Sequence, residues 1–309
     1  MRYLSLRLVQ AILAILGAST IVFFVLHLSS DPVLLLAPQN ATPADVARLR
    51  HQLGLDQPIW VQYVTFLQNL IRGNLGYSYV QDQRAIDLVL DRLPYTAELA
   101  VAALVLSLAV GVPIGMLTAV YRGTWIEQAL MPIILVGQSM PSFWSGILLI
   151  LLFSVHFHWL PSSGTGGIRS LILPAITLAS LTMATFARMT RSSFMEQLDQ
   201  EYVRTARSKG VGAGRIMVAH VLRNASIPII TVLGLETANL LGGAVITETI
   251  FAWPGIGLLT VQAIAARDFP IIQAVVLLAS VIFISANLLT DLLYGVVDPR
   301  IRLGGEAAT

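Results

Sequence analysis

The chain has 309 residues, of which 56% are hydrophobic and only 12% are charged. Soluble domains carry about 25% charged residues, so this composition excludes a soluble globular protein and indicates a membrane protein with several spans. The net charge of +2 rests on arginines near the ends of apolar stretches, which is not the basic stripe of a nucleic-acid-binding protein. Without cysteine, the chain has no disulfide, no thiolate catalysis and no cysteine-ligated metal.

The first predicted membrane span runs from Leu8 to Leu28. This largely apolar stretch follows Arg2 and Arg7 and is long enough to cross about 30 Å of hydrocarbon. The alternative is a cleavable signal peptide, but such a peptide has a shorter apolar core and a small-x-small cleavage site, which does not follow here. We therefore expect a retained span.

The stretch from Asp31 to Arg92 is polar enough to lie outside the bilayer and is predicted to hold three short helices. Thr42 resembles an N-cap, and Gly54 marks the end of the first helix. Residues 56–72 predict a second helix, and residues 85–93 a third. These helices could lie on the membrane surface or cover the external mouth of a transport path. The apolar face of the second comprises Ile59, Tyr63, Phe66, Leu67, Leu70 and Ile71.

Five further spans are predicted downstream. The second span of the chain carries Gly111 and Gly115, a spacing typical of closely packed helices. The third is interrupted at Pro141, because a proline frees a backbone carbonyl and bends the helix. Within a bilayer such a break is tolerated only where neighbours or water satisfy that carbonyl. The five spans are expected at residues 96–120, 129–155, 171–187, 227–248 and 271–294.

The distribution of basic residues predicts the topology. Six spans place both termini on one side, and that side holds twelve arginine and lysine residues in its short loops and chain ends. The short loops on the opposite side hold two, Arg169 and Arg267. Because basic residues are enriched in short cytoplasmic loops, both termini and the loop between the fourth and fifth spans are expected in the cytoplasm.

That cytoplasmic loop, from Arg188 to Asn224, holds seven basic residues against three acidic ones, a net charge of +4. Residues 193–208 predict one amphipathic helix, which glycines from Gly210 onward then break. A second short helix is predicted from Arg215. Two short helices joined at glycines would form a surface on which another protein can push. The apolar positions of the two helices are Phe194, Leu198, Val203 and Ala206, then Ile216, Met217, Val218, Val221 and Leu222.

The carboxylate of Glu236 falls near the middle of the predicted fifth span. A charge at the bilayer centre costs about 2.5–3.5 kcal/mol on insertion scales. Glu236 is therefore expected to face a wet transport path or a protein interior, with Thr237 and Asn239 nearby. The alternative is a buried packing residue whose carboxyl group is hydrogen-bonded.

Polar residues also occur in the third and sixth spans. Gln138, Ser139 and Ser142 surround the break in the third span and are candidates for lining the path. Hydroxyl groups that stabilise the kink itself account for them equally well. Asn287 and Asp291 share a face of the sixth span, where Asp291 is expected to have a structural partner such as an arginine.

No constellation for catalysis or metal binding is found in the sequence. The five histidines form no HExxH motif, and His156 and His158 stand together at the end of a span, where an interfacial position is more common than a metal site. The chain also lacks a Gly-x-x-x-x-Gly-Lys-Ser/Thr phosphate-binding loop. It is therefore not expected to be an enzyme, to bind a metal or cofactor, or to hydrolyse ATP itself.

Two sets of residues carry a family resemblance. The first is ARSKG, ending at Gly210, then nine residues and HVLRNA. It resembles the cytoplasmic "EAA" loop of bacterial ABC-importer permeases, in the variant of the dipeptide/oligopeptide/nickel group. The general loop has Glu-Ala-Ala before the glycine and Ile-x-Leu-Pro after it. This chain fits the general form at Ala206, Gly210 and Leu222.

The second set is three blocks near the C-terminal end, GGAVITETIFAWPGIG from Gly242, ARDFPIIQA from Ala266 and NLLTDLLYGVVDPRIR from Asn287. In this order they closely resemble the dipeptide/oligopeptide/nickel permease family. LGLDQP and the long first external loop are similar to its B-type subunit. Ser-Ser-Asp-Pro at residues 29–32 stands where the family usually has Pro-Gly-Asp-Pro, so the local turn is expected to differ.

The resemblance implies an all-α membrane protein with six transmembrane helices in the type I ABC importer (MetI-like) permease fold. Residues 1–94 would form the first span and a helical periplasmic loop. Residues 95–298 would form a five-helix core with the coupling loop at 188–225, and residues 299–309 a cytoplasmic tail. The coupling-loop residues implied are Glu201, Tyr202, Arg204, Thr205, Ala206, Arg207, Lys209, Gly210, His220, Arg223 and Asn224.

A periplasmic motif is also implied by the resemblance. Trp253 is expected in a rigid turn at the external membrane interface, where tryptophan is favoured. Arg267 and Asp268 are expected to pair and to brace the start of the sixth span. The implied residues of the motif are Glu248, Trp253, Pro254, Gly255, Arg267 and Asp268.

By resemblance, the chain is the multi-pass permease subunit of an ABC importer that moves peptides across the bacterial inner membrane. The implied partners are the bilayer, a homologous C-type permease, one or two cytoplasmic ATPase subunits that bind ATP and magnesium, and a periplasmic or lipid-anchored solute-binding protein, with no nucleic acid. A nickel chelate, another metal chelate or glutathione is the alternative cargo.

Functions of other classes are also open to a membrane protein of this composition. An ion-coupled secondary transporter could use Glu236, but it usually shows an internal repeat across more spans, which is not found. A membrane-embedded hydrolase would need a convergent set of histidine and acidic or serine residues at span ends, which is also not found. A channel would conduct without an ATPase partner.

Overall fold

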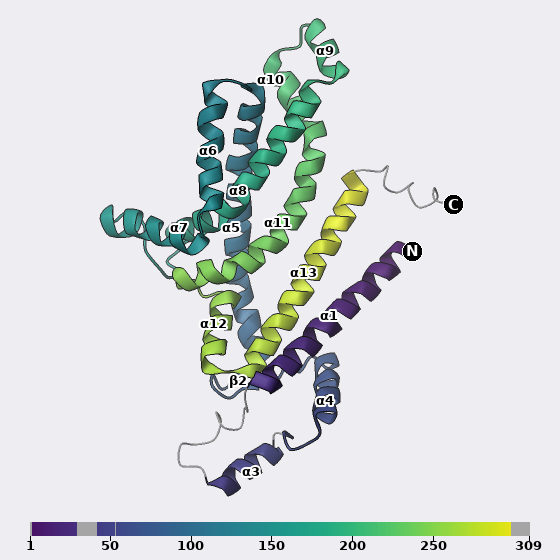
Figure 1. Cartoon of the computed structure of the whole chain (residues 1–309), viewed down its shortest axis with the longest axis vertical. Helices are drawn as coiled ribbons and strands as arrows, with labels where there is room; N and C mark the ends of the chain where they lie inside the picture. The colour runs from purple at the N-terminus through teal and green to yellow at the C-terminus, as the bar shows by residue number, and fades with distance from the viewer. Residues whose placement is uncertain (1, 30–41, 53, 298–309) are drawn as a thin grey trace. The chain divides into compact units, whose positions relative to one another are not determined.

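A computed structural model describes residues 2–29, 42–52 and 54–297, which are mostly helical (Figure 1). The chain divides into two compact units. The first unit comprises Met1–Pro94 and Gly255–Ile284, and the second comprises Tyr95–Pro254 and Ser285–Thr309. The turn expected at residues 29–32 and the tail expected at 299–309 fall largely or wholly outside the described residues.

The first unit contains short helices whose ends follow from the sequence. At the start of α3, the N–H of Asp45 donates to Oγ1 of Thr42 at 3.3 Å, and the N–H of Thr42 donates to Oδ2 of Asp45 at 3.0 Å. This reciprocal cap confirms the predicted helix start. Gly54 and Gly73 follow α3 and α4 with φ of +68° and +71°, a conformation cheap for glycine. The helices are α1 (Arg2–Ser29), α3 (Pro43–Gln52) and α4 (Ile59–Ile71).

Aromatic side chains pack α1 against α4. The ring of Phe23 is buried, and its centroid lies 5.3 Å from those of both Tyr63 and Phe66. The hydroxyls of Thr20 and Tyr63 are 2.6 Å apart. Tyr63 and Phe66 therefore lie on the packed face of α4, as predicted, whereas Ile71, assigned to the same face, is 85% exposed.

A two-stranded antiparallel hairpin corrects the expectation of an all-α fold. β1 (Tyr77–Ser78) pairs with β2 (Gln83–Arg84) immediately before α5. Strands of two residues are too short to show an alternating pattern, so the sequence gives no sign of them. The hairpin positions the buried side chain of Ser78, whose hydroxyl donates to the carboxylate of Asp268.

The core of the first unit lies between the start of α5, α12 and α13. α5 spans Ala85–Val120, α12 spans Ile256–Ala266 and α13 spans Phe269–Val297. The bounds of α13 include Asn287 and Asp291, whose side chains lie outside the described ones. The buried residues of this core are Ala85, Leu88, Val89, Ile256, Leu259, Ala263, Ile271, Ala274 and Val275.

The short helix predicted at 85–93 and the span predicted at 96–120 are one helix, α5. Pro94 lies inside it and removes one backbone donor, but the helix continues. Val89 and Leu99, on either side of Pro94, are fully buried. Burial of apolar side chains before and after the proline outweighs the lost hydrogen bond.

In the second unit, α6, α7 and α11 pack on α8. Close approach of α5 to α8 confirms the packing role predicted for Gly111 and Gly115. A methyl group added at Gly111 would lie 2.7 Å from the carbonyl oxygen of Met183, and one added at Gly115 would lie 2.5 Å from that of Ala187. These helices are α6 (Trp125–Ser139), α7 (Ser142–Leu149), the π-helix η1 (Ile150–His156), α8 (Ile168–Leu198) and α11 (Leu222–Ile250).

The predicted third span is two helices. α6 and the α7–η1 stretch are bent by 107° at a break that contains Pro141. The predicted disruption is therefore confirmed, but it turns the chain through more than a right angle rather than merely bending it. Among the described residues, four helices are long and apolar enough to cross a membrane, or five if this bent pair is one span.

Candidate functional site

The candidate site is the segment at residues 188–225, whose central helix is α9 (Glu201–Ser208). α8 extends to Leu198, and Gln200 then adopts an extended backbone with φ of −75° and ψ of 148°. The single helix predicted at 193–208 is therefore two. Asp199 and Gln200 are the separating residues, since aspartate competes with the helix for its own backbone groups. Glu201 in the first turn of α9 then favours a new helix start.

Gly210 terminates α9 in the way its sequence position predicts. Its φ is +76°, and its N–H donates to the carbonyl of Arg207 at 2.9 Å. The N–H of Val211 donates to the carbonyl of Ala206 at 3.1 Å. This pair of bonds is a Schellman motif, in which the left-handed residue reverses the chain and satisfies the last helical carbonyls. Space around Gly210 is open, so the requirement for glycine is conformational.

One face of α9 is anchored in an apolar cluster. Val203 is fully buried and packs in this cluster, which also contains Phe194 of α8 and Ala119 of α5. The cluster also includes Val221 at the end of the π-helix η2 (Ile216–Val221) and Ala225 in the first turn of α11. Burying a valine side chain contributes about 1.5–3 kcal/mol. Val203 therefore connects α9 to the ends of three long helices.

The opposite face of α9 is charged and exposed. Arg204 donates to Oε1 of Glu201 at 2.9 Å, and both side chains are more than 70% exposed, so the pair adds little stability. Three cations against one carboxylate make this face basic. Tyr202 is half-buried, and its hydroxyl donates to Oε1 of Gln197 at 3.0 Å. The exposed predicted residues are Glu201, Arg204, Thr205, Arg207, Lys209 and Gly210.

The second short helix predicted from Arg215 is instead the beginning of a continuous helical stretch. α10 (Ala213–Arg215), the π-helix η2 (Ile216–Val221) and α11 follow one another directly. Val218, assigned to the apolar face, is 61% exposed, because a π turn holds more residues than an α turn and rotates the following side chains. His220, Arg223 and Asn224 are exposed, as a binding surface requires.

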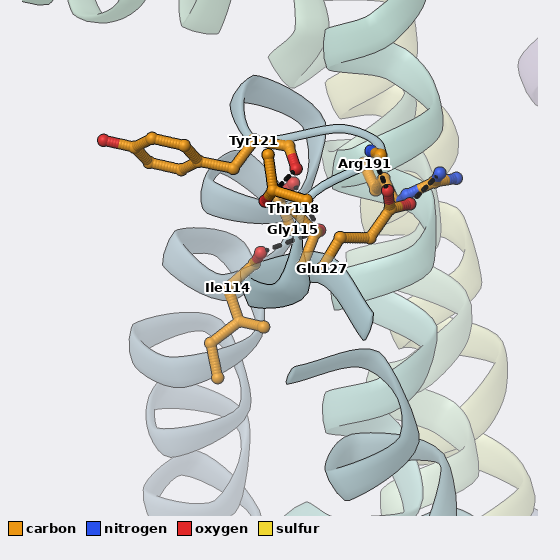
Figure 2. A network of polar contacts seen from close by, with 8 residues as sticks. Ile114, Gly115, Thr118, Tyr121, Glu127 and Arg191 are labelled. Carbon is orange, nitrogen blue, oxygen red and sulfur yellow. Dashed lines mark hydrogen bonds and ion pairs between the residues drawn. The ribbon is translucent and has the colours of Figure 1, made fainter. Parts of the chain in front are cut away.

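Glu127 fastens the turn between α5 and α6 to α8 (Figure 2). Its Oε2 accepts from the N–H of Gly123 at 2.7 Å, and its Oε1 accepts from the guanidinium of Arg191. The side chains of Glu127 and Arg191 are only 17% and 27% exposed. In the same network, the hydroxyl of Thr118 donates to the carbonyls of Ile114 and Gly115. We call the Gly123–Glu127–Arg191 contact the clamp.

Sequence reasoning placed Arg191 in the basic segment but did not identify its partner. A usable signal exists, because Glu127 is the only charged residue of α6. A single carboxylate at the start of an apolar helix, in a chain with an arginine-rich segment at the end of another span, predicts an ion pair between the two.

The structure places Glu236 on α11 beside an exposed stripe. Its Oε2 accepts from the side-chain amide of Asn239 at 3.4 Å. Glu236 is half-buried, so it is neither a sealed packing residue nor fully exposed. Exposed residues of α11 recur every three or four positions on the side that includes Asn239, as expected for one helix face. They are Leu235, Asn239, Gly242, Ile246 and Thr249.

The polar residues at the break between α6 and α7 serve their own helices. The hydroxyl of Ser139 donates to the carbonyl of Leu135 at 2.9 Å. The carbonyl of Ser142 accepts from the hydroxyl of Ser145 at 3.0 Å. Gln138 and Ser142 are half-buried, and Ser139 is exposed. These contacts support the alternative interpretation, in which hydroxyls stabilise the kink.

Trp253 lies in the core of the second unit, which corrects the expectation of an interfacial tryptophan. It is 2% exposed, and its Nε1–H donates to the carbonyl of Tyr95 at 2.9 Å. Glu248 is fully buried and accepts from the hydroxyl of Thr96 at 2.7 Å. The N–H of Trp253 also donates to the carbonyl of Glu248 at 2.8 Å. This part of the motif therefore joins the end of α11 to α5.

The motif residues Gly255, Arg267 and Asp268 lie in the first unit, and the predicted pair between Arg267 and Asp268 does not form. Arg267 is exposed with φ of +53° and ends α12. Asp268 is buried and accepts from Ser78, and its carbonyl accepts from the N–H of Ile272 at 3.1 Å. Asp268 alone thus braces the start of α13. Gly255 begins α12 with an extended backbone, and Pro254 precedes it.

Within the described part of the chain, no three histidine or acidic side chains come together in a way that could hold a metal ion. The candidate site is therefore a basic helix face on a buried anchor, with the clamp nearby on α8 and, on α11, Glu236 beside an exposed stripe of mixed polarity. Such an arrangement can bind a protein surface and move a helix.

Two family profiles match the chain. "Binding-protein-dependent transport system inner membrane component" matches residues 111–303, and the N-terminal part of the same kind of membrane component matches residues 1–100. The first match contains the whole 188–225 segment, the clamp and Glu236.

Similar proteins are found over almost the whole length. A putative peptide transport system permease protein of Brucella abortus is 42% identical over 96% of this chain and 97% of its own length. The dipeptide transport system permease protein DppB of Escherichia coli is 38% identical over 98% of this chain and 99% of its own. The di/tripeptide permease DppB of Pseudomonas aeruginosa is 39% identical over 97% and 98%.

Solved structures with a similar fold are ABC transporters. An inward-facing structure of the MetNI methionine ABC transporter matches with a TM-score of 0.58 at 17% identity, over 68% of this chain and 96% of that one. An amino acid ABC transporter with histidines matches with a TM-score of 0.54 at 20% identity, over 67% and 93%. At these identities the likeness concerns the fold, which is that of MetI-type permeases. With the profile and sequence matches, it shows that the chain belongs to the inner-membrane permeases of binding-protein-dependent ABC importers, in the DppB-type group.

Proposed function

We propose that this chain is the B-type subunit of an importer that moves peptides, and that α9 is where ATP-driven motion enters it. One observation carries the proposal: α9 presents a basic, exposed face on a buried anchor, Val203, which packs in one apolar cluster with residues near the ends of α5 and α8 and the start of α11. A helix held in this way can be pushed from outside without separating from the helices behind it. The relatives named for dipeptides and tripeptides support the choice of cargo.

The proposed topology has six spans with both termini in the cytoplasm. α1, with 28 residues and an apolar stretch at Ile12–Val25, supplies the first span. The bent α6 and α7–η1 pair is counted as one more. Residues 1–94 would form the first span with its periplasmic helices, residues 95–298 the permease core, and residues 299–309 a cytoplasmic tail. The basic α9 face would then meet cytoplasmic partners.

The proposed mechanism passes from α9 to α11. ATPase subunits that bind ATP and magnesium would close and displace α9, and the cluster around Val203 would transmit that movement to the start of α11. α11 carries Glu236 and the exposed stripe, so its movement would reorient a polar face. This face would line the path, which would lie between this chain and a homologous C-type permease. A solute-binding protein would deliver peptide on the periplasmic side.

Crosslinking tests the proposal, because the chain has no native cysteine. Thr205→Cys on the exposed face of α9 is expected to crosslink to a co-expressed ATPase subunit in membranes. Val136→Cys on α6, which is 51% exposed, is the matched control and should not. Equal crosslinking at both positions, or none at position 205, would refute α9 as the contact.

Transport assays then separate the cargoes and mechanisms. Proteoliposomes with all subunits are expected to take up a radiolabelled dipeptide only when ATP is supplied to the ATPase side. Uptake of a nickel chelate or glutathione in preference to the dipeptide would reassign the cargo. Uptake driven by a proton gradient without ATP would instead indicate an ion-coupled secondary transporter.

A further inference from the structure

A stripe of apolar side chains on α4 is left exposed within the first unit. Trp60, Val64, Leu67 and Ile71 follow one another at intervals of four, three and four residues, which places them on one side of a helix. Trp60 is 68% exposed, Val64 51% and Ile71 85%, and Leu67 is half-buried. The stripe lies beside the face that Tyr63 and Phe66 pack against α1.

The side of α4 opposite the stripe is mostly polar, and α4 carries no charge. Thr65 and Asn69 lie on that side beside Val61, whereas Gln68, four residues after Val64, borders the stripe. The neighbouring helix α3 differs sharply, because it carries several charged residues within ten positions. An amphipathic helix can lie in the plane of a membrane interface with its apolar face toward the acyl chains, and the uncharged α4 would do so through its apolar area alone.

The apolar surface continues from α4 onto α1. The rings of Phe24 and Tyr63 lie with centroids 5.7 Å apart, and Phe24 remains partly exposed. On the same stretch of α1, Ile21 and Val25 are 65% and 53% exposed. If α1 is the first span, as the proposed function holds, these side chains face lipid. The stripe on α4 then extends a lipid-facing surface.

We propose that α4 lies in the outer leaflet of the bilayer, with its stripe in contact with phospholipid. Trp60 is placed near the headgroups, where tryptophan is favoured. The flanking charges, Asp56 before α4 and Arg72 after it, lie in the water or among headgroups. α4 thereby holds the outer end of α1 at a fixed depth, and the polar side of α4 lines an open cavity together with Pro270 and Gln273.

Labelling of single cysteines tests the position of α4. The full chain is labelled with an environment-sensitive NBD fluorophore at Val64→Cys or Ile71→Cys and placed in nanodiscs of phosphatidylethanolamine and phosphatidylglycerol. Thr65→Cys, an exposed position on the polar side of the same helix, is the matched control. Ile21→Cys on α1 serves as the lipid-facing reference. Quenching is measured with aqueous iodide and with nitroxide-labelled lipid, and neither readout depends on transport.

Labels at positions 64 and 71 are expected to emit at shorter wavelength than the label at 65 and to be quenched by the nitroxide lipid about as strongly as at position 21. Iodide should quench position 65 several-fold more. Equal iodide quenching at 64, 65 and 71 would overturn the proposal, as would protection of 64 and 71 from both quenchers, which indicates a protein neighbour. Because α9 crosslinking is read separately, failure here would leave the proposed function intact.

Discussion

The carboxylate of Glu127 contacts the guanidinium of Arg191 and so joins the first turn of α6 to α8, two turns before α8 ends at Leu198. The same carboxylate accepts from the N–H of Gly123 in the α5–α6 turn. One residue therefore holds the end of α5, the start of α6 and the end of α8 together, and α5 and α8 also contribute to the apolar cluster that anchors α9. A force on α9 can therefore reach α6 through α8 and the clamp.

The first prediction concerns this clamp. Glu127→Gln removes the negative charge while it keeps the side-chain shape, so Arg191 loses its ion pair in a largely buried position. Removing one partner of such a pair leaves an uncompensated charge. We expect ATP hydrolysis by the assembled transporter to continue while peptide uptake per ATP falls. Both rates are measured in the same proteoliposomes.

The control for the clamp is Glu196→Gln, an exposed carboxylate on the same helix as Arg191. It should leave both rates unchanged. The double variant Glu127→Gln/Arg191→Gln should be less impaired than Glu127→Gln alone, because it leaves no unpaired cation. Additive losses in the double variant would show that the two residues act separately.

The second prediction concerns the end of α9. Gly210→Val forces a β-branched residue to φ of +76°, which costs about 1–2 kcal/mol for an L-residue. We expect the Schellman motif to open and the orientation of α9 to become variable. Membrane insertion should be normal, but ATP hydrolysis should no longer be coupled to uptake.

Gly212→Val is the matched control for Gly210→Val. Both glycines have open space around them, but Gly212 has φ of −60°, which any residue adopts. Coupled transport is therefore expected to survive at position 212. Normal uptake by the Gly210→Val transporter would refute the role of α9 as a rigid element.

The helical segments were predictable because apolar runs of sufficient length identify them. The contact at Gly111 and Gly115 and the end of α9 at Gly210 were also predictable, because only a residue without a Cβ permits so close an approach or so cheap a left-handed turn. The burial of Trp253 was not predictable. A tryptophan next to Pro254 at the end of a span suits an interface and a core equally well, and only packing with Tyr95 decides.

The location of the candidate site in the chain was predictable, but the contacts that hold it in place were not. Charge and glycine spacing located α9, whereas its anchor depends on long-range contacts between Val203 and residues of α5 and α11. The clamp likewise joins residues that are 64 positions apart in the chain. The sequence around the break between α8 and α9 could form either one continuous helix or two separate helices. Helix propensity alone does not decide between them.

The third prediction concerns the contact of α5 with α8. Gly115→Ala places a methyl group 2.5 Å from the carbonyl oxygen of Ala187 and 2.6 Å from Cβ of Thr190, so the helices must separate. Overpacking of this kind costs about 1–3 kcal/mol. We expect a lower midpoint of thermal unfolding in detergent. Gly137→Ala on α6, where the nearest atom is 3.9 Å away, should leave the midpoint unchanged.

The last prediction concerns the junction between α3 and α4, where Nδ1 of His51 and Oδ2 of Asp56 are 2.6 Å apart. The hydrogen bond to Asp56 raises the pKa of His51 above its usual 6.5, and the bond to His51 lowers the pKa of Asp56 below its usual 3.8. A raised histidine pKa stabilises the junction below pH 6.5. This stabilisation is lost as the pH rises through the raised pKa of His51. A lowered aspartate pKa stabilises the junction above pH 3.8. This stabilisation is lost as the pH falls through the lowered pKa of Asp56.

The junction should therefore be most ordered between those two usual values. Hydrogen exchange of residues 54–57, corrected for the intrinsic rate, is expected to be slower at about pH 5.5 than at about pH 8.5. His51→Gln should remove this difference, because its side chain does not titrate. A pH dependence that persists in His51→Gln would show that another group controls the junction.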